Sequence, residues 1–137
     1  MAYWLLKTEP TEYSFDQLEK DKIAPWTGVR NFEARNNLQE MKVGDLVVIY
    51  HTGDDKEIVG FGEIVKEAYP DPTAETGSWV CVDVKYLARA GRGLGLEEIR
   101  NTHNLSVMPV VERPRLSVHS VNQSQWQDIL KYTKTIL

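Results

Sequence analysis

The run from Leu46 to Tyr50 constrains the fold most, because it is apolar at every position. A strand with one solvent-facing side alternates apolar and polar residues, and this run does not. It is instead typical of a strand that is buried on both faces. The other elements of the chain therefore have to be arranged around this strand.

Further segments have the apolar, aromatic and β-branched composition of strands. The polar stretch Thr52–Asp55 predicts a hairpin connection between the apolar run and the strand that follows it. Prolines end two of the predicted strands, at Pro10 and within Tyr69–Pro72. The additional strands are predicted over residues 3–8, 58–67, 79–87 and 116–121.

Paired polar residues predict where two helices begin. Ser14 with Gln17 forms a capping-box pattern, in which Ser14 is the N-cap and the Gln17 side chain reaches back to it. Asn122 with Gln125 repeats the pattern before a closing helix. Helices are therefore predicted from residue 15 to about 21 and from residue 123 onward.

Asn31 is a good N-cap for another helix, which is predicted to run to about residue 41. Gly91, Gly93 and Gly95 predict a mobile loop before a short helix over residues 96–100. Together the elements predict an α+β fold of about five or six mostly antiparallel strands with flanking short helices. Glycines within strands often mark bends, so a curled sheet or small barrel fits. The 137 residues are expected to form one domain.

Composition narrows the classes of function. The net charge of −4 argues against a general, non-specific nucleic-acid binder, although it leaves room for a local basic patch. The single cysteine, Cys81, is interpreted as a small buried residue of a strand, since it has no partner for a disulfide or a zinc site. No apolar stretch approaches the roughly 18 residues of a membrane span, and the N-terminus lacks the pattern of a signal peptide.

Two strand patterns suggest a pocket, and each has a plainer alternative. Gly60 and Gly62 lie on the same face of their strand, where the missing side chains would leave a hollow unless the strand bends or packs closely there. Trp79 is out of phase with the apolar positions Val80 and Val82. It is therefore a surface residue, a lid at the strand end, or a stacking wall for a flat ligand.

The segment Trp26–Asn31 is the strongest candidate for a binding site. It combines a large aromatic ring, a turn glycine and the guanidinium of Arg30 just before a helix N-terminus, whose backbone donors are unpaired. Such a set could hold a base edge or a phosphate. The alternative is an ordinary helix entry with Trp26 packed in the core.

Seven motifs resemble, in the same order, those of the EVE domain, a PUA-like family that includes thymocyte nuclear protein and many bacterial single-domain proteins. One region departs from the family pattern, because the chain has AGRGLGLEEI where many members carry a proline-containing segment. The likeness covers essentially the whole chain. The matching motifs are YWLLKTEP, YSFDQL, WTGVRNFEARNNL, MKVGDLVVIYH, IVGFGEIVKEAYPDPTA, WVCVDV and RPRLSV.

The resemblance implies a PUA-like curled β-barrel that reads modified nucleic-acid bases, with modified cytosine in DNA or a modified RNA base as the ligand. YTH relatives hold a methylated base in an aromatic cage, and Trp26 matches the position of the first cage tryptophan, with Trp79 near the second. The predicted base-binding residues are Thr8, Glu9, Trp26, Thr27, Gly28, Arg30, Asn31, Tyr50, His51, Trp79 and Ser117. The predicted phosphate-binding residues are Lys7, Arg35 and Arg115.

Two other classes of function stay open at this point. Some ASCH relatives act on modified nucleosides, and Glu9 with Lys7 is the only local candidate for an acid–base pair. A protein-interaction module is also compatible with the acidic net charge. No catalytic residue, metal site or cofactor is predicted. The expected partner is DNA or RNA with a modified base, and the chain is expected to be a cytoplasmic monomer, or nuclear in a eukaryote.

Overall fold

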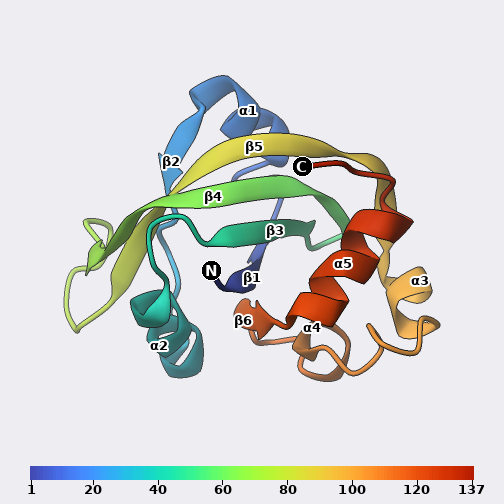
Figure 1. The fold of residues 1–137 in the computed structure, drawn as a ribbon. Coiled ribbons are helices and arrows are strands. Elements are labelled where there is room, and N and C mark those ends of the chain that lie inside the picture. The colour runs from blue at the N-terminus through green and yellow to red at the C-terminus, as the bar shows by residue number, and fades with distance from the viewer.

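The computed structural model describes residues 1–137 and contains one six-stranded sheet, in the order β2-β5-β4-β3-β1-β6. Five helices surround it (Figure 1). The strands are β1 (Tyr3–Thr8), β2 (Ile23–Pro25), β3 (Leu46–His51), β4 (Glu57–Pro70), β5 (Val80–Gly95) and β6 (Val118–Val121). The helices are α1 (Phe15–Asp21), α2 (Phe32–Glu40), α3 (Leu96–Arg100), α4 (Pro109–Glu112) and α5 (Gln123–Tyr132).

The sheet is strongly curved and remains open. The neighbours β1 and β3 are parallel, and every other neighbouring pair is antiparallel. The long strands β4 and β5 arch across the molecule, and β2 and β6 form the two edges (Figure 1). The predicted α+β class, the mostly antiparallel pairing and the curled sheet are confirmed, whereas the sheet does not close into a full barrel.

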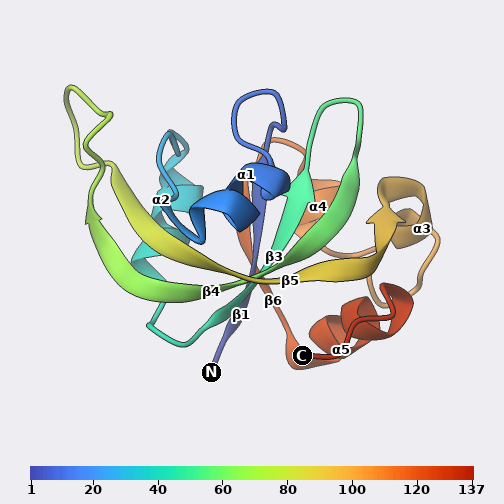
Figure 2. The same cartoon turned by 90° about the horizontal axis from the view of Figure 1, so that it is seen from above.

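The strand β3 is buried on both faces, as its apolar run predicts. Val47 and Ile49 belong to one hydrophobic core, which includes residues of α1 and α2. Val48 and Tyr50 belong to a second core on the opposite face, which includes Trp126 of α5. Figure 2 shows α1 and α2 on one side of the β4–β5 arch and α5 on the other. None of the helices combines the length and apolar character needed to cross a membrane.

The predicted helix caps are present, with one difference. The Asn122 side chain and Gln125 form a complete capping box at the start of α5. At α1 the Ser14 hydroxyl accepts a hydrogen bond from the Gln17 backbone N–H at 3.1 Å. The Gln17 side chain, however, donates to Asp21 at 2.9 Å instead of reaching back. The α1 box is therefore only half formed.

The glycine-rich segment before α3 is part of β5, so the prediction of a loop there is wrong. The Gly91 N–H donates to the Thr135 hydroxyl at 3.0 Å, and a Cβ added at Gly91 would overlap the backbone of Lys134. The glycine therefore lets the C-terminal segment lie directly against the strand. The short elements β2 and α4 were not predicted, because three or four residues are too few to show a periodic pattern.

The strand glycines of β4 do not line a hollow. A Cβ added at Gly60 would overlap the ring of Phe15, and one added at Gly62 would lie 2.8 Å from a methyl carbon of Val84. The space is filled by side chains from α1 and β5. The plainer alternative, close packing, is the one that the structure shows.

Gly60→Ala is therefore expected to lower the free energy of unfolding by about 1–3 kcal/mol, since the added methyl group displaces the fully buried Phe15 ring. Urea unfolding followed by circular dichroism measures the change. Gly95→Ala is the matched control, because nothing lies within 4 Å of a Cβ added there. Equal losses in the two variants would contradict the packing argument.

Candidate functional site

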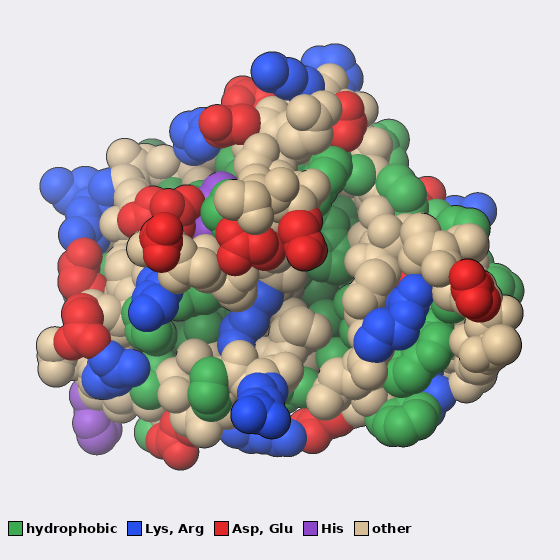
Figure 3. All heavy atoms as spheres, turned by 180° about the vertical axis from the view of Figure 1, so that it is seen from behind, with side chains coloured by type: hydrophobic (Ala, Val, Ile, Leu, Met, Phe, Trp, Pro, Cys, Tyr) green, Lys and Arg blue, Asp and Glu red, His purple; other side chains and the backbone are tan.

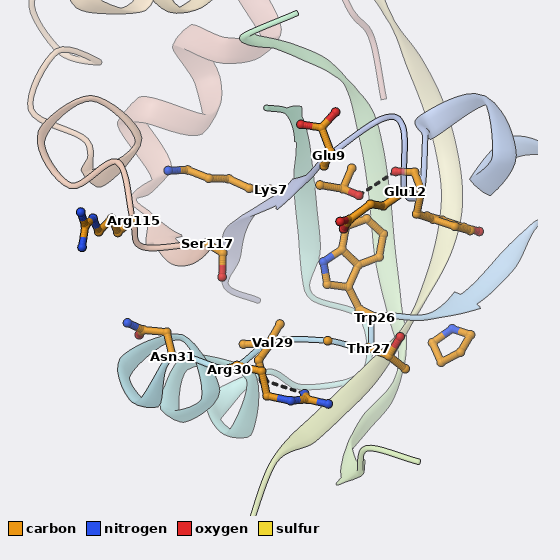
Figure 4. A pocket seen from close by; sticks show the side chains of 14 residues that line it. Lys7, Glu9, Glu12, Trp26, Thr27, Val29, Arg30, Asn31, Arg115 and Ser117 are labelled. Atoms are coloured by element: carbon orange, nitrogen blue, oxygen red, sulfur yellow. Dashed lines mark hydrogen bonds between the residues drawn. The ribbon is translucent and has the colours of Figure 1, made fainter. Parts of the chain in front are cut away.

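A pocket of about 580 Å³ opens where the end of β1, the segment after β2 and the segment before β6 meet (Figure 4). The molecular face in Figure 3 is hollowed at its centre, with acidic side chains on one side of the hollow and basic ones on the other. The pocket is lined by Lys7, Thr8, Glu9, Glu12, Tyr13, Pro25, Trp26, Thr27, Gly28, Val29, Arg30, Asn31, Arg115 and Ser117.

Trp26 lies at the base of this pocket and also belongs to the hydrophobic core. Its backbone N–H donates to the carbonyl of Val82 at 2.8 Å, which extends the pairing of β2 with β5. Its ring meets the Tyr13 ring edge to face, with 6.1 Å between the ring centres. Only 7% of the residue is exposed. The two interpretations of Trp26, core residue and pocket wall, therefore both hold.

Asp71 holds the loop that follows Trp26. Gly28 has a φ of +86°, and its N–H donates to the Asp71 carboxylate at 2.9 Å. The same carboxylate accepts a hydrogen bond from Arg30 at 3.0 Å and two from Thr73, each at 2.7 Å. Its side chain is fully buried. One buried carboxylate thus joins the pocket loop to the turn after β4.

The pKa of Asp71 reflects these contacts. Burial raises the pKa, but the hydrogen bonds from Thr73, from the Gly28 backbone and from Arg30 outweigh it and lower the pKa to about 2. Asp71 is therefore ionised at neutral pH. Its charge is matched by Arg30, and this pairing explains how the carboxylate can remain buried behind the pocket loop.

Arg30 lines the pocket but is already engaged. Its guanidinium donates to the Val29 carbonyl, to Asp71 and to the Thr73 hydroxyl, each at 3.0 Å. These bonds assign Arg30 a positioning role within the loop. They leave fewer donors for a bound phosphate than the sequence suggested.

Asn31 is the N-cap of α2, as predicted. Its side-chain oxygen accepts a hydrogen bond from the Ala34 N–H at 2.9 Å. The side-chain NH₂ has no partner within the protein, and the residue lines the pocket. This amide can therefore donate to a ligand without disturbing the cap.

The end of β1 supplies further polar groups. The Thr8 hydroxyl donates to the Tyr13 carbonyl at 2.6 Å and so closes the turn after the strand. The Lys7 ammonium donates to the Pro114 carbonyl at 3.0 Å, and burial lowers its pKa. Glu9 accepts a bond from the Thr11 hydroxyl at 3.2 Å. Thr8 and Glu9 thus stabilise the turn as well as lining the pocket.

Two groups at the mouth of the pocket remain uncommitted. Neither the Ser117 hydroxyl nor the Arg115 guanidinium takes part in a side-chain hydrogen bond or ion pair within the protein. Figure 4 shows both on the side of the pocket opposite Trp26. They are therefore available to a ligand.

Tyr50 and His51 do not line this pocket. Tyr50 is 4% exposed and packs in the second core, on the far face of the sheet. The Nε2 atom of His51 accepts a hydrogen bond from the Phe15 N–H at 3.0 Å, and its Nδ1 lies 3.0 Å from Asp55. His51 therefore stabilises the start of α1. The structure therefore does not bring Tyr50 and His51, which were predicted to contact the base, to this pocket.

Trp79 and Arg35 also lie outside the pocket. Trp79 precedes β5 and stacks on Phe32 of α2, with 5.0 Å between ring centres. Arg35 donates to the Ser78 hydroxyl at 2.7 Å. Of the alternatives that the sequence left open for Trp79, a wall of this pocket is not the one that the structure shows, because Trp79 packs on Phe32.

The predicted site residues do not include several that line or support the pocket, among them Pro25 and Val29. Glu12 and Tyr13 line the pocket from the turn after β1, and Asp71 anchors its loop. The pair Asp71 and Thr73 is a local turn pattern that could have been recognised. Its partner Gly28 lies 43 residues away, so sequence spacing could not reveal the contact. No group of three or more His, Cys, Asp or Glu side chains is placed to hold a metal ion.

The chain is thus an α+β domain with a curved open sheet and a mostly polar pocket, of ligand size, that is lined by Trp26. The chain belongs to the EVE domain family, whose pattern matches residues 2–132. Thymocyte nuclear protein 1 of Mus musculus is 33% identical in an alignment 167 positions long, gaps included, which covers 97% of this chain and 74% of the mouse protein. The Gallus gallus protein of the same name is 32% identical and covers 94% and 67% of the two chains.

Solved structures show the same fold. A protein of Agrobacterium tumefaciens is 31% identical, with a TM-score of 0.93 and coverage of 98% of this chain and 94% of that one. The human THYN1 protein, solved in complex with DNA containing 5-methylcytosine, is 28% identical, with a TM-score of 0.90 over 100% of both chains. A YTH domain from Zygosaccharomyces rouxii has a TM-score of 0.63 at 13% identity, covers 99% and 88% of the two chains, and shares the fold alone.

Proposed function

We propose that this domain binds nucleic acid and holds one modified base in the pocket over Trp26, without transforming it. The pocket itself carries the proposal: an indole at its base, polar groups on its walls and two basic side chains, Lys7 and Arg115, beside it. A flat aromatic ligand with hydrogen-bonding edges fits this combination. A nucleobase is such a ligand.

The human THYN1 structure names the first ligand to test. That protein was solved with DNA containing 5-methylcytosine, and its chain aligns with this one from end to end. Because the two chains share 28% of their residues, the comparison supports the same ligand class here. DNA carrying 5-methylcytosine is therefore the first ligand to test, and RNA with a modified base is tested beside it.

Stacking on Trp26 alone does not supply enough free energy to hold an extruded base. Extruding a base from a duplex costs a few kcal/mol, and stacking on one aromatic ring returns about 1–3 kcal/mol. The surplus has to come from the edges of the base. The free Asn31 amide and the Ser117 hydroxyl are the first candidates. The Glu12 carboxylate can accept from an exocyclic amino group.

Val29 offers an apolar surface for a methyl group. It lines the pocket, belongs to the same core as Trp26 and is 7% exposed. A methyl group at this wall would exclude water from apolar surface, which is worth about 0.8 kcal/mol for one buried carbon. The expected preference for a methylated over an unmethylated base is therefore about fourfold.

The structure does not favour the enzyme alternative. An ASCH-like reaction would need Glu9 and Lys7 to act as an acid–base pair. Instead, Glu9 accepts from Thr11, and the Lys7 ammonium is held on the Pro114 carbonyl. Each group thus has its own structural partner, and the pocket is better suited to holding a base than to transferring a proton.

A fluorescence-anisotropy screen tests the proposal. Single- and double-stranded oligonucleotides would carry cytosine or 5-methylcytosine in DNA, and unmodified or methylated bases in RNA. We expect tighter binding to at least one modified oligonucleotide than to its unmodified match. Equal, weak binding to every oligonucleotide would reject base recognition and favour a protein-interaction module. Mass spectrometry of the same mixtures would show turnover if the domain were an enzyme.

Arg115→Ala is expected to weaken binding of every oligonucleotide about threefold. Loss of one phosphate contact should also make the slope of log K against log salt shallower by about 0.9 for duplex DNA and about 0.7 for single strands. The matched control is Lys131→Ala on α5, which lies on the other side of the β4–β5 arch. A change that is confined to the modified oligonucleotide would instead assign Arg115 to base recognition.

A further inference from the structure

A second aromatic surface lies beside the pocket and is not part of it. It consists of Phe32 and Trp79 with the guanidinium groups of Arg30 and Arg35, and we call it the Phe32–Trp79 platform. The two rings stack with 5.0 Å between their centres and 24° between their planes. The Arg35 guanidinium lies 5.0 Å from the Phe32 ring centre and 5.7 Å from that of Trp79.

Trp79 is half-buried, but the Phe32 side of the platform is exposed, and the fold does not explain this exposure. Phe32 is the first residue of α2, belongs to neither hydrophobic core and is 65% exposed even though it stacks on Trp79. A large aromatic side chain that is left in water is a common mark of an interaction surface when it adjoins other apolar groups. The stacked pair therefore offers a flat surface for a further ring.

Two groups of the platform, the Arg35 charge and the Trp79 indole N–H, are not matched by a partner in the protein. Arg35 donates to Ser78 and Asn36 but makes no ion pair, so its positive charge has no carboxylate to balance it. The indole N–H of Trp79 has no hydrogen-bond partner in the protein. A phosphate group could accept bonds from both, because guanidinium and indole groups are donors only.

The platform is continuous with the pocket through Arg30. This residue lines the pocket, and its guanidinium also lies 5.8 Å from the Trp79 ring centre. Phe32 directly follows Asn31, the N-cap residue that lines the pocket. In Figure 3, apolar and basic side chains adjoin on the flank of the hollow. A strand with one base in the pocket would therefore pass its neighbouring nucleotide over this platform.

We propose that the Phe32–Trp79 platform stacks the nucleotide next to the captured base and that Arg35 contacts its phosphate. This inference rests on the proposed function. A nucleotide is favoured over a peptide because it combines a flat ring with a negative charge, which complements a ring pair beside the unpaired charge of Arg35. Stacking of this kind accepts any base, so the platform adds affinity without adding sequence preference.

Phe32→Ala tests the platform. Its affinity for the modified oligonucleotide is expected to fall about 10-fold, as loss of one base-stacking contact predicts. The side chain is 65% exposed and outside both cores, so the variant is expected to unfold at the temperature of the parent protein. Tyr132→Ala is the matched control, since Tyr132 is also an exposed aromatic residue with a lysine over its ring. The control should leave affinity unchanged.

Two further oligonucleotides make the test specific. In one, the nucleotide on the 5′ side of the modified base is replaced by an abasic site, and in the other the nucleotide on the 3′ side is replaced. The parent protein should lose about 10-fold in affinity for one abasic probe, whereas Phe32→Ala should bind that probe and the complete strand equally. This non-additivity would show that Phe32 and the flanking base contact each other.

The outcomes separate the two proposals. If the parent protein binds the modified oligonucleotide and Phe32→Ala binds it equally well, the platform proposal is overturned while the pocket proposal stands. Additive losses from the variant and the abasic site would also overturn it, because the two would then act independently. If the parent protein binds no oligonucleotide, the proposed function itself fails.

Discussion

Replacing Trp26 with alanine is expected to lower affinity for the modified oligonucleotide by about 100-fold, because the base would lose its stacking surface and the shape of its pocket. Binding would be measured by fluorescence anisotropy against the modified strand and its unmodified match. The difference between the two strands should disappear in the variant. Residual non-specific binding through Lys7 and Arg115 should remain and should weaken with salt.

The same substitution is also expected to destabilise the domain. Trp26 is 7% exposed and packs in the core with residues such as Val82, so its removal leaves a cavity. Truncating a buried tryptophan to alanine typically costs about 3–5 kcal/mol, which is a large part of the 5–15 kcal/mol that stabilises most domains. Circular dichroism therefore has to accompany the binding measurement, so that loss of binding can be separated from loss of folding.

Ser117→Leu separates pocket loss from core loss. The larger side chain would occupy the mouth of the pocket, while Trp26 and the core stay unchanged. We expect this variant to keep its unfolding temperature and to lose binding of the modified base. Retained preference for the modified strand in a folded Trp26→Ala or Ser117→Leu variant would locate the base outside this pocket.

Asp71→Ala is the second change with a large expected effect. The buried carboxylate accepts hydrogen bonds from Gly28, Arg30 and Thr73, and its loss would leave those donors without a partner. Removing one member of a buried charged pair costs about 3–5 kcal/mol. The Arg30 side chain is 37% exposed and can be rehydrated, so about 2–4 kcal/mol is expected here. Urea unfolding measures this loss.

Asp71→Ala should also weaken binding, although the residue does not line the pocket. Its carboxylate holds the backbone of Gly28 and the side chain of Arg30, and both of those residues are pocket walls. Asp71→Asn, which keeps the shape but removes the charge, should lie between the parent protein and the alanine variant. Full binding by a folded Asp71→Ala protein would show that the loop keeps its position without this anchor.

The pH dependence of stability provides an independent test of the same carboxylate. The folded pKa of Asp71 is lowered from 3.8 to about 2, so its ionised form stabilises the fold at pH values above about 4. This contribution, about 2 kcal/mol, is lost as the pH falls from about 4 toward 2. The difference in stability between the parent protein and Asp71→Asn should therefore shrink over that range. A constant difference would exclude a titrating Asp71.

Local sequence patterns were sufficient to predict most elements of the fold. The polar residues Ser14, Asn31 and Asn122 each cap a helix where expected, because a cap depends only on the next three residues. The apolar run 46–50 was correctly interpreted as a strand buried on both faces. The residue types of segment 26–31 indicated a pocket loop, the family resemblance supported it, and the structure shows that this segment lines the pocket.

Local sequence patterns could not predict how the ends of the strands are arranged in space. Tyr50 and His51 end a strand parallel to β1, and the alternation of the strand directs Tyr50 into the second core. Trp79 follows a loop whose path sets its final position, and no periodicity describes a loop. The hollow expected at Gly60 is filled by Phe15, a residue 45 positions earlier in the chain.

By itself, then, the sequence determined the elements, the strand buried on both faces and the segment that forms the pocket. These properties depend on neighbouring residues, whose spacing is set by the backbone. Only the tertiary structure decided that Trp26 serves both core and pocket, that Asp71 anchors the loop, and that Trp79 lies on Phe32 beside the pocket. Each of these depends on contacts between distant segments, which form only when the sheet curves and its loops meet.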